Sequence, residues 1–249
     1  MKTTAIIPAR MGSSRFPGKP LAKILNKPMI EHVYKRTAMC KALDSVYIAT
    51  CDQEVIDATE SFGGKAIMTS DAHERASDRT AEAVSSLDVD VVVMVQGDEP
   101  MLNPLMIAEA LMPFEIEPEI PCVNLTKRID NQVEFTSPST IKVVTDIKGD
   151  ALYMSRQTIP NSPNGDVSKI IAMKQVCIIP FRRDALLKFS SLDQTPLEIA
   201  ESIDMMRFLE NGIPVRMVPT KFETQAVDTP EDLARVEVLM RKDLLTATY

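Results

Sequence analysis

A run of seven residues, Val89 to Val95, sets the strongest limit on the fold. Its sequence, VDVVVMV, is almost entirely apolar. A strand without a polar face must be covered on both sides, which is typical of the centre of a parallel sheet. Apolar segments at 5–7, 21–25 and 45–50 are also expected to be strands, with helices at 28–40 and 53–62. This alternation predicts an α/β fold with a doubly wound, mostly parallel sheet.

The second half of the chain has a different character. A segment rich in Pro and Glu, 115–121, follows a helix predicted for 104–114. Beyond it the sequence predicts more closely spaced strands at 121–127, 140–145, 151–155 and 170–181, and helices at 183–189 and 196–211. A further helix is expected to open at Asp228–Asp232. We therefore expect one domain, 1–249, whose two halves meet near residue 120.

The loop after the first strand carries a local excess of positive charge. It holds Arg10, Arg15 and Lys19 with two glycines, and it has no acidic residue. Glycine lets backbone amides turn toward a ligand, and fixed cations then favour a polyanion such as a triphosphate. Five residues separate Gly12 from Gly18, and Pro20 follows Lys19, so the loop is not a P-loop. A basic surface turn is the alternative interpretation.

Asp98 is the first candidate for a metal ligand. It follows the apolar strand in the sequence QGDEP. A carboxylate there is costly unless a cation or hydrogen bonds receive it, and Mg²⁺ takes one or two carboxylates plus substrate phosphates. The alternative is that Asp98 accepts amide hydrogen bonds in a turn. Asp228 is the best second carboxylate, although its place before a helix favours simple capping when spacing alone is considered.

Composition excludes several classes of protein. A net charge of −7 argues against a surface that coats nucleic acid, and no apolar run approaches the length of a membrane span. The four cysteines are far apart and only two histidines accompany them, so a zinc site is not expected. Scattered thiols, and first residues that lack a signal-peptide pattern, predict a cytoplasmic protein.

Eight short motifs, read in order, resemble the CMP-Kdo synthetases (3-deoxy-manno-octulosonate cytidylyltransferases). The resemblance covers nearly the whole chain. The motifs include IIPARMGSSRFPGKPL (6–21), DRTAEA (78–83), QGDEPM (96–101), PSTIKVV (138–144), ALYMSRQTIP (151–160) and VDTPEDLARV (227–236). The family implies a Rossmann-like fold of the nucleotide-diphospho-sugar transferase type with a smaller strand-rich dimerisation region. The halves 1–120 and 121–249 would then bind the nucleotide and the acceptor, respectively.

The resemblance also implies a reaction. The anomeric 2-hydroxyl of a 2-keto-3-deoxy sugar acid, Kdo by default, attacks the α-phosphorus of CTP to give a CMP-sugar and pyrophosphate. Such sugars serve lipopolysaccharide or capsule synthesis. The implied partners are CTP, an acidic small-molecule acceptor and a second copy of the chain in a homodimer, with Mg²⁺ as the cofactor.

Carried over by position, the resemblance assigns residues to roles. The triphosphate would be held by Arg10, Ser13, Arg15 and Lys19, and Arg79 and Gln96 would line the nucleotide pocket. Asp98 and Asp228 would hold Mg²⁺, so the expected catalytic set is Arg10, Lys19 and Asp98. Lys142, Arg156, Gln175 and Asp204 would bind the acceptor. His73 is expected to make a local hydrogen bond, with contact to nucleotide as the alternative.

The chain departs from the family pattern where the sugar acid is held. A His and a Tyr of one strand appear here as Gln175 and Ile179, and a Glu-Gln pair appears as Asp204-Met205. Buried polar contacts discriminate strongly between substrates. A modified octulosonate, a nonulosonate or a phosphonate therefore stands as an alternative acceptor. A nucleotide-binding protein without catalysis is the non-enzyme alternative.

Overall fold

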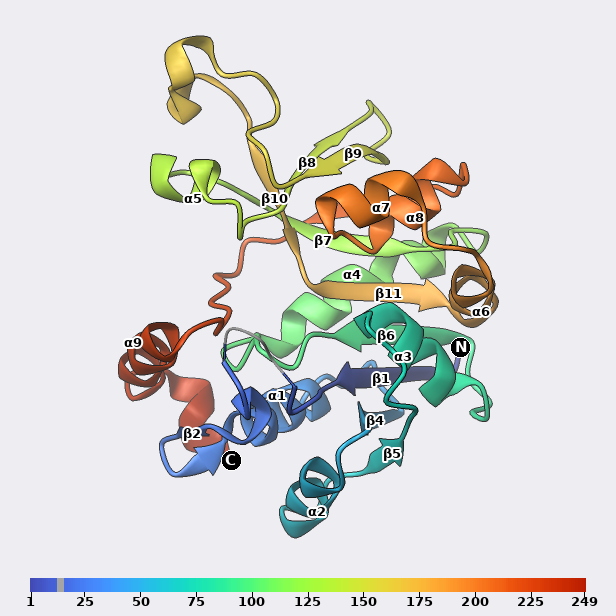
Figure 1. Ribbon diagram of the computed structural model, residues 1–249, viewed down its shortest axis with the longest axis vertical. Helices are drawn as coiled ribbons and strands as arrows, with labels where there is room; N and C mark the ends of the chain where they lie inside the picture. Colours follow the sequence, from blue (N-terminus) through green and yellow to red (C-terminus); the bar gives the residue numbers. More distant parts are fainter. Residues whose placement is uncertain (13–15) are drawn as a thin grey trace. The chain divides into compact units, whose positions relative to one another are not determined.

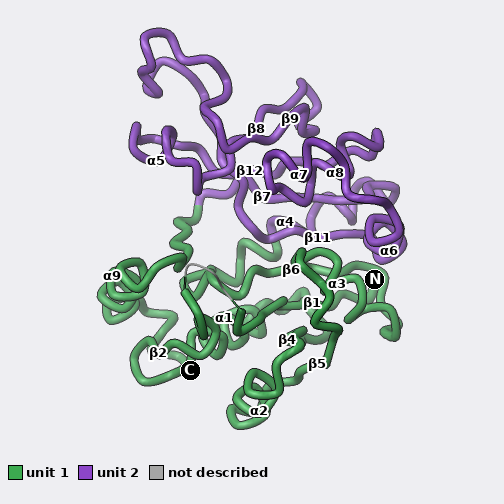
Figure 2. Tube along the Cα trace, viewed as in Figure 1, with its two compact units in different colours: residues 1–108, 222–249 green, residues 109–221 purple. Residues whose placement is uncertain are grey.

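The computed structural model describes residues 1–12 and 16–249 of the chain. These residues form two compact units, one of Met1–Ala108 with Phe222–Tyr249 and one of Glu109–Lys221 (Figure 2). The last segment of the chain returns to the first unit, so both ends of the sequence contribute to it. The halves predicted from the sequence, 1–120 and 121–249, omit this return, and their division by function stays a prediction.

The first unit is built on a parallel sheet (Figure 1). Neighbouring strands follow the order β6 (Val91–Val95), β1 (Thr3–Pro8), β4 (Ser45–Thr50) and β5 (Ala66–Met68). Every residue of β1 and β6 is buried, as the apolar sequence predicts for central strands. β1 and β6 pair in parallel from Thr3 opposite Val91 to Ile6 opposite Met94. Their carboxyl ends therefore lie next to each other, so the basic loop after β1 and the segment after β6 start side by side.

Three helices connect these strands and pack against them. α1 (Met29–Ala38) contacts β1 and β4, α2 (Gln53–Ser61) contacts β4 and β5, and α3 (Ala76–Val84) contacts β1, β4 and β6. α9 (Pro230–Met240) belongs to the same unit and contributes to a buried apolar cluster of Ile24, Met29, Val227, Val236 and Met240. The chain ends near α1.

The second unit is strand-rich, as predicted. Its sheet has the order β12 (Arg216–Pro219), β7 (Val123–Arg128), β10 (Met173–Val176), β8 (Lys142–Thr145) and β9 (Ala151–Ser155). β12 pairs with β7 in parallel and the other pairs are antiparallel. The unit also contains β11 (Ile178–Arg182), α5 (Gln132–Thr136), α6 (Arg183–Ser191), α7 (Pro196–Glu201) and α8 (Met205–Glu210). α4 (Pro104–Ile116) carries the chain into it. Across the described ranges, no helix combines the length and the apolar character needed to cross a membrane.

Three predicted elements are wrong in detail. The strand expected at 21–25 is only β2 (Lys23–Ile24), which pairs with β3 (Lys27–Pro28) after a left-handed turn at Leu25 and Asn26. The strand expected at 170–181 is divided into β10 and β11, because the buried Asn124 amide donates to the Val176 carbonyl, 2.7 Å away.

The single helix expected at 196–211 is two helices. Ser202 adopts a left-handed conformation with φ of 54° between α7 and α8. The Glu201 and Ser202 carbonyls accept hydrogen bonds from the Arg156 guanidinium at 2.7 and 3.1 Å, so these carbonyls do not continue the helix ladder.

Candidate functional site

Hydrogen bonds hold the described ends of the basic loop. The Gly18 amide donates to the Met11 carbonyl at 3.0 Å, and the Met11 amide donates to Asp52 Oδ2 at 2.7 Å. Gly18 has a φ of 72°, which a residue with a Cβ rarely adopts, and it leads directly into Lys19. Ser13 and Arg15, both predicted to bind triphosphate, lie outside the described residues, so their roles stay predictions.

Lys19 stands between the two predicted metal ligands. Its Nζ donates to Asp98 Oδ2 at 2.7 Å and lies 3.6 Å from Asp228 Oδ1. It also donates to the Val227 carbonyl at 3.0 Å. The side chains of Lys19, Asp98 and Asp228 are 14%, 24% and 25% exposed, so the cluster is partly open to solvent. The structure therefore brings together residues from the beginning, the middle and the end of the chain.

Close packing of the β6 end places Asp98. A Cβ built on Gly97 would lie 3.0 Å from the Pro8 carbonyl oxygen and 3.2 Å from Ile30 Cδ1. Only glycine fits there without a shift of its neighbours, so the end of β6 can approach the end of β1. Asp98 thereby reaches the loop that follows β1.

A capping box holds the backbone of Asp228. The Thr229 side chain accepts from the Asp232 amide at 3.2 Å, and Asp232 Oδ2 accepts from the amides of Asp228 and Thr229, both at 3.0 Å. Partial burial alone would raise the pKa of Asp232, but these amide donors bring it below its ordinary value. The capping role is therefore filled by Thr229 and Asp232, and the Asp228 carboxylate faces Lys19 instead. The Val227 amide adds a bond to the Asp98 carbonyl at 2.9 Å.

A pocket of about 290 Å³ opens beside this cluster, within the first unit. Its lining carries an excess of cationic side chains over carboxylates. The pocket is lined by Arg10, Lys19, Arg75, Arg79, His73, Glu74, Gln96, Gly97 and Asp98, with Pro8, Ala9, Pro20, Met29 and Ala76. Predicted residues Arg10, Lys19, Arg79, Gln96 and Asp98 thus share one pocket, whose charge suits a polyanionic ligand. Arg75 and Glu74 also line this pocket, but nothing in the sequence except their position in a polar loop marks them as pocket residues.

Arg79 organises one wall of the pocket. Its side chain is buried, and Nη1 donates to Thr69 Oγ1 at 2.5 Å and to the Ser70 carbonyl at 3.2 Å. Nη2 donates to the His73 carbonyl at 3.3 Å, and His73 Nε2 lies 2.5 Å from Glu82 Oε2. His73 therefore has the expected local hydrogen bond and also lines the pocket.

Lys142 and Arg156, predicted to bind the acceptor, bind backbone in the second unit. Lys142 is fully buried, and its Nζ donates to the carbonyls of Ser137, Thr140 and Arg156 at 2.9, 2.6 and 2.5 Å. Burial, with help from the nearby Arg156 charge, lowers the pKa of Lys142. The Arg156 guanidinium donates to three carbonyls, those of Pro138, Glu201 and Ser202. An acceptor role for either residue stays a prediction.

The other acceptor candidates have equally defined surroundings. Gln175 stands at the position where the family pattern has a His. Its Nε2 donates to Asn124 Oδ1 at 2.6 Å, so its side-chain amide is already bonded within the protein. Ile179 and Met205 are core residues, 3% and 0% exposed, and Asp204 precedes α8 in a half-buried position.

The donor set at Lys19 suits a divalent cation shared with a substrate. Two carboxylates converge on one point, and Mg²⁺ commonly combines such a pair with phosphate oxygens. A site supplied wholly by protein would need more ligands. Among residues 1–12 and 16–249, no group of three or more His, Cys, Asp or Glu side chains is placed to hold a metal. Asp98 and Asp228 could therefore hold a cation only together with oxygens of a ligand, such as a polyphosphate.

Comparisons with known proteins agree over nearly the whole chain. Residues 4–222 match the family model for cytidylyltransferases. The 3-deoxy-manno-octulosonate cytidylyltransferase of Geobacter metallireducens is 46% identical over 245 residues, which cover 95% of this chain and 96% of that protein. The protein of that name from Geotalea uraniireducens is 44% identical, with 97% and 100% covered.

A solved structure shows the same fold. It is the CMP:2-keto-3-deoxy-manno-octonic acid synthetase complexed with CTP, which is 40% identical with a TM-score of 0.91. The match covers 98% of this chain and 100% of the other.

Proposed function

This chain belongs to the cytidylyltransferase family, and from that premise we propose that it activates a 2-keto-3-deoxy sugar acid with CTP. Kdo is the default acceptor, because 3-deoxy-manno-octulosonate stands in the names of the relatives. The anomeric 2-hydroxyl oxygen attacks the α-phosphorus, and the bond to the oxygen shared with the β-phosphorus breaks. Pyrophosphate leaves with that electron pair, the hydroxyl proton passes to water, and the CMP-sugar remains.

The contact of Lys19 with both aspartates carries the proposal. Phosphoryl-type transfer asks a protein mainly to position the reactants and to neutralise charge. Lys19 and Arg10 supply positive charge to a pocket that can receive the triphosphate, and Gln96 offers hydrogen bonds to the nucleotide. Asp98 and Asp228 balance Lys19 when no nucleotide is present.

Mg²⁺ fits the two carboxylates, and Asp98 and Asp228 would hold it. When bound, it neutralises phosphate charge and lowers the pKa of the attacking hydroxyl. This chemistry needs no histidine base, and His73 is engaged with Glu82. Lys19, which contacts both carboxylates in the absence of nucleotide, would then pair with phosphate oxygens instead.

Pyrophosphate release tests the function. We expect release from CTP with Kdo in the presence of Mg²⁺, and no release with EDTA or with the Asp98→Asn variant. A panel that replaces Kdo by a modified octulosonate, a nonulosonate and a phosphonate tests the acceptor. Release with one of these alone would retain CTP use and reject Kdo. CTP binding without release from any acid would instead support a nucleotide sensor.

A different acid is the second candidate, and the Gln175–Asn124 pair favours it. The amide at position 175 is bound to a buried neighbour and Ile179 has no polar group, so hydrogen bonds to sugar hydroxyls differ here from the family pattern. The acceptor panel decides between this candidate and Kdo.

We also infer a cytoplasmic homodimer that uses the strands after Pro121. Large apolar side chains of the second unit, Val133, Leu152 and Ile171, are more than half exposed and support an interface there. All four cysteines are free, which suits a reducing compartment. Sedimentation velocity would give the dimer mass, and a monomer at micromolar concentration would reject the interface.

A further inference from the structure

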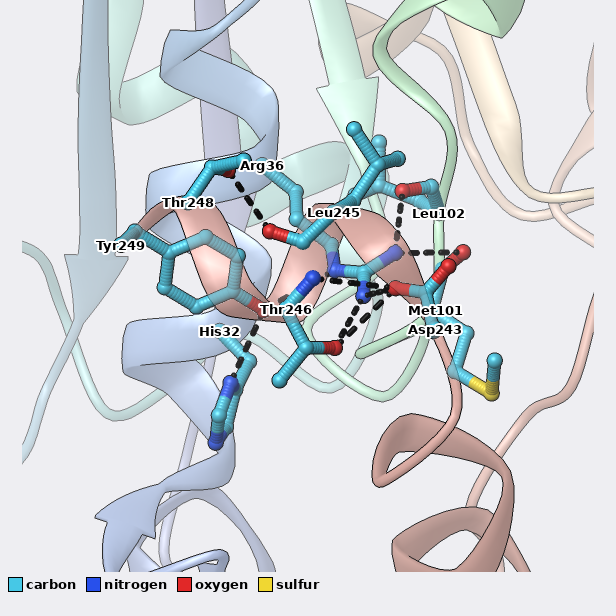
Figure 3. Close-up of polar contacts among 9 residues, drawn as sticks. All are labelled: His32, Arg36, Met101, Leu102, Asp243, Leu245, Thr246, Thr248 and Tyr249. Carbon is cyan, nitrogen blue, oxygen red and sulfur yellow. Dashed lines mark hydrogen bonds and ion pairs between the residues drawn. The ribbon is translucent and has the colours of Figure 1, made fainter.

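The last residues of the chain pack against α1 in the first unit. We define the C-terminal clasp as His32 and Arg36 of α1 with Asp243, Thr246 and Tyr249 of the final segment. Figure 3 shows these side chains turned toward one another, with the Arg36 guanidinium among them. The clasp lies outside the pocket lining, and the proposed reaction does not use it.

Arg36 joins three segments through one guanidinium. Its side chain is 1% exposed. Nη1 donates to the Met101 and Leu102 carbonyls at 3.2 and 3.3 Å. Nη2 donates to Thr246 Oγ1 at 2.8 Å and pairs with Asp243. One buried cation therefore links α1, the segment after Asp98 and the segment after α9.

Tyr249 completes the clasp, and the donor and the acceptor of each of its hydrogen bonds can be assigned. Arg36 Nε donates to the Tyr249 hydroxyl at 2.9 Å. His32 Nε2 lies 2.8 Å from the Ile24 carbonyl, which can only accept, so that nitrogen carries the proton. His32 Nδ1 then accepts from the Tyr249 hydroxyl at 3.0 Å. Burial lowers the pKa of His32, in agreement with a neutral ring.

The segments that Arg36 joins are the ones that carry the two candidate metal ligands. Asp98 directly precedes the turn in which the Leu102 amide donates to the Glu99 carbonyl at 3.1 Å. Asp228 stands before α9, and Asp243 follows its end. The Val227–Asp98 backbone bond joins the near ends of the two segments, while Arg36 joins their far ends. Between these two points lies the apolar cluster of Ile24, Met29, Val227, Val236 and Met240, against which Met101 packs.

A purely stabilising role does not account well for a charge in this place. Burying a guanidinium is costly, and well-packed apolar side chains of similar volume are often as stabilising. What the planar fork adds is fixed geometry, because it bonds several acceptors in set directions. Those acceptors lie on the two segments whose relative position sets the spacing of Asp98 and Asp228.

We propose that Arg36, through the C-terminal clasp, is a positioning residue that holds Asp98 and Asp228 at the spacing that binds a divalent cation with the nucleotide. The inference rests on the proposed function of that pair. Arg36 touches neither aspartate, and it acts through the turn after Asp98 and through α9. Loosening the clasp should therefore weaken cation binding while the pocket keeps its lining residues.

Binding of Mn²⁺ in the presence of CTP and without acceptor tests this inference. Mn²⁺ replaces Mg²⁺ because its electron paramagnetic resonance signal, compared with that of the same Mn²⁺–CTP mixture without protein, reports the ion held by the protein. The variants are Arg36→Lys, which keeps the charge and removes the fork, and Tyr249→Phe, which removes only the hydroxyl. Arg207→Lys is the matched control, because Arg207 is 2% exposed and paired with buried Glu198 in the second unit.

We expect Arg36→Lys to raise the Kd for Mn²⁺ about tenfold, as loss of a supporting contact behind metal ligands does. Tyr249→Phe should give a smaller increase, and Arg207→Lys should leave the Kd unchanged even if its melting temperature falls. An unchanged Kd in Arg36→Lys, or an equal rise in Arg207→Lys, would overturn the inference. If Arg36→Lys does not fold, Tyr249→Phe decides in the same way. Failure of the wild-type protein to bind Mn²⁺ with CTP would overturn the metal role of Asp98 and Asp228, and the inference with it.

Discussion

Lys19 in the first unit and Lys142 in the second are both lysines that the family resemblance assigns to the site, and their surroundings differ in kind. Lys19 faces two carboxylates in a partly open cluster. Lys142 is sealed from solvent, and its three donors go to three backbone carbonyls. An ammonium with carboxylate partners and solvent access can exchange those partners for phosphates. An ammonium whose three donors all bond buried backbone carbonyls mainly holds the surrounding backbone in place.

Arg36 and Arg156 extend the same contrast to the guanidinium group. Arg156 ties the break between α7 and α8 to the segment before β8, wholly within the second unit. Arg36 ties the segments that carry Asp98 and Asp228. A buried cation can thus shape a site without touching it, and the chemistry of its partners shows which role it has.

The largest expected effect is at Asp98. The substitution Asp98→Asn keeps the size of the side chain and removes the charge that faces Lys19. We expect kcat to fall by about a thousandfold or more, because charge stabilisation at the reacting phosphate is lost. Pyrophosphate release measures this loss, and thermal unfolding should show an intact fold. An unchanged kcat would remove Asp98 from the metal site.

The two lysines can be compared directly by the same substitution. Lys19→Met should lower kcat/KM for CTP about a hundredfold, since a cation at the triphosphate is removed. Lys142→Met should instead lower the free energy of unfolding by about 3 kcal/mol, because buried carbonyls lose their donor. Steady-state kinetics and urea unfolding on both variants provide the measurement.

The contrast between the lysines fails if these effects are exchanged. A Lys142→Met variant of normal stability with a raised KM for the acceptor would show that Lys142 contacts substrate. A Lys19→Met variant with unaltered KM and kcat would show that Lys19 does not.

A smaller effect is expected at Gly97, where packing rather than charge sets the geometry. Gly97→Ala places a Cβ against the Pro8 carbonyl, so the ends of β1 and β6 must separate slightly. We expect kcat to fall about tenfold, since small displacements of catalytic groups are costly. The loss in unfolding free energy should stay near 1 kcal/mol. Full activity with this stability loss would mean that the strand spacing does not place Asp98.

The smallest effect concerns His32, a buried group that the fold keeps neutral. Burial, helped by the charges of Lys27 and Arg36, lowers its pKa below the ordinary value of 6.5. When the pH falls below about 6.5, His32 takes up a proton more readily in the unfolded chain than in the folded protein. The free energy of unfolding should therefore fall as the pH falls. Urea unfolding between about pH 7.5 and 5.5 measures this, in a window above the titration of most carboxylates. His32→Gln should lack this decline, and an equal decline in both proteins would contradict the assignment.

The local sequence pattern predicts correctly those strands whose residues are buried in a regular order along the chain. The strand at Ser45–Thr50 and the strand at Ala151–Ser155 have the predicted bounds, because alternation and β-branched residues report burial directly. The position of Asp98 beside the basic loop also follows from parallel strand order, since both lie at carboxyl ends of neighbouring strands.

The local pattern does not predict the breaks in two elements, because each break involves a side chain that donates a hydrogen bond to backbone far away in the sequence. The break at Ser202 depends on Arg156, and the break after Val176 depends on Asn124. Neither partner is visible in a local window. The spacing of Asp228 suits a helix cap, and only the structure shows that Thr229 and Asp232 fill the capping role. The contact of Tyr249 with Arg36 could not be predicted from the sequence, because it joins the last residue to α1.

A double-mutant cycle on Asp98 and Asp228 tests the central claim most directly. Asp98→Asn, Asp228→Asn and the double variant are compared by kcat/KM for CTP at fixed Mg²⁺. If both carboxylates hold one cation beside Lys19, the double variant should be little worse than the more damaged single variant. Losses that multiply would show that the two aspartates act independently, and a single shared site would be contradicted.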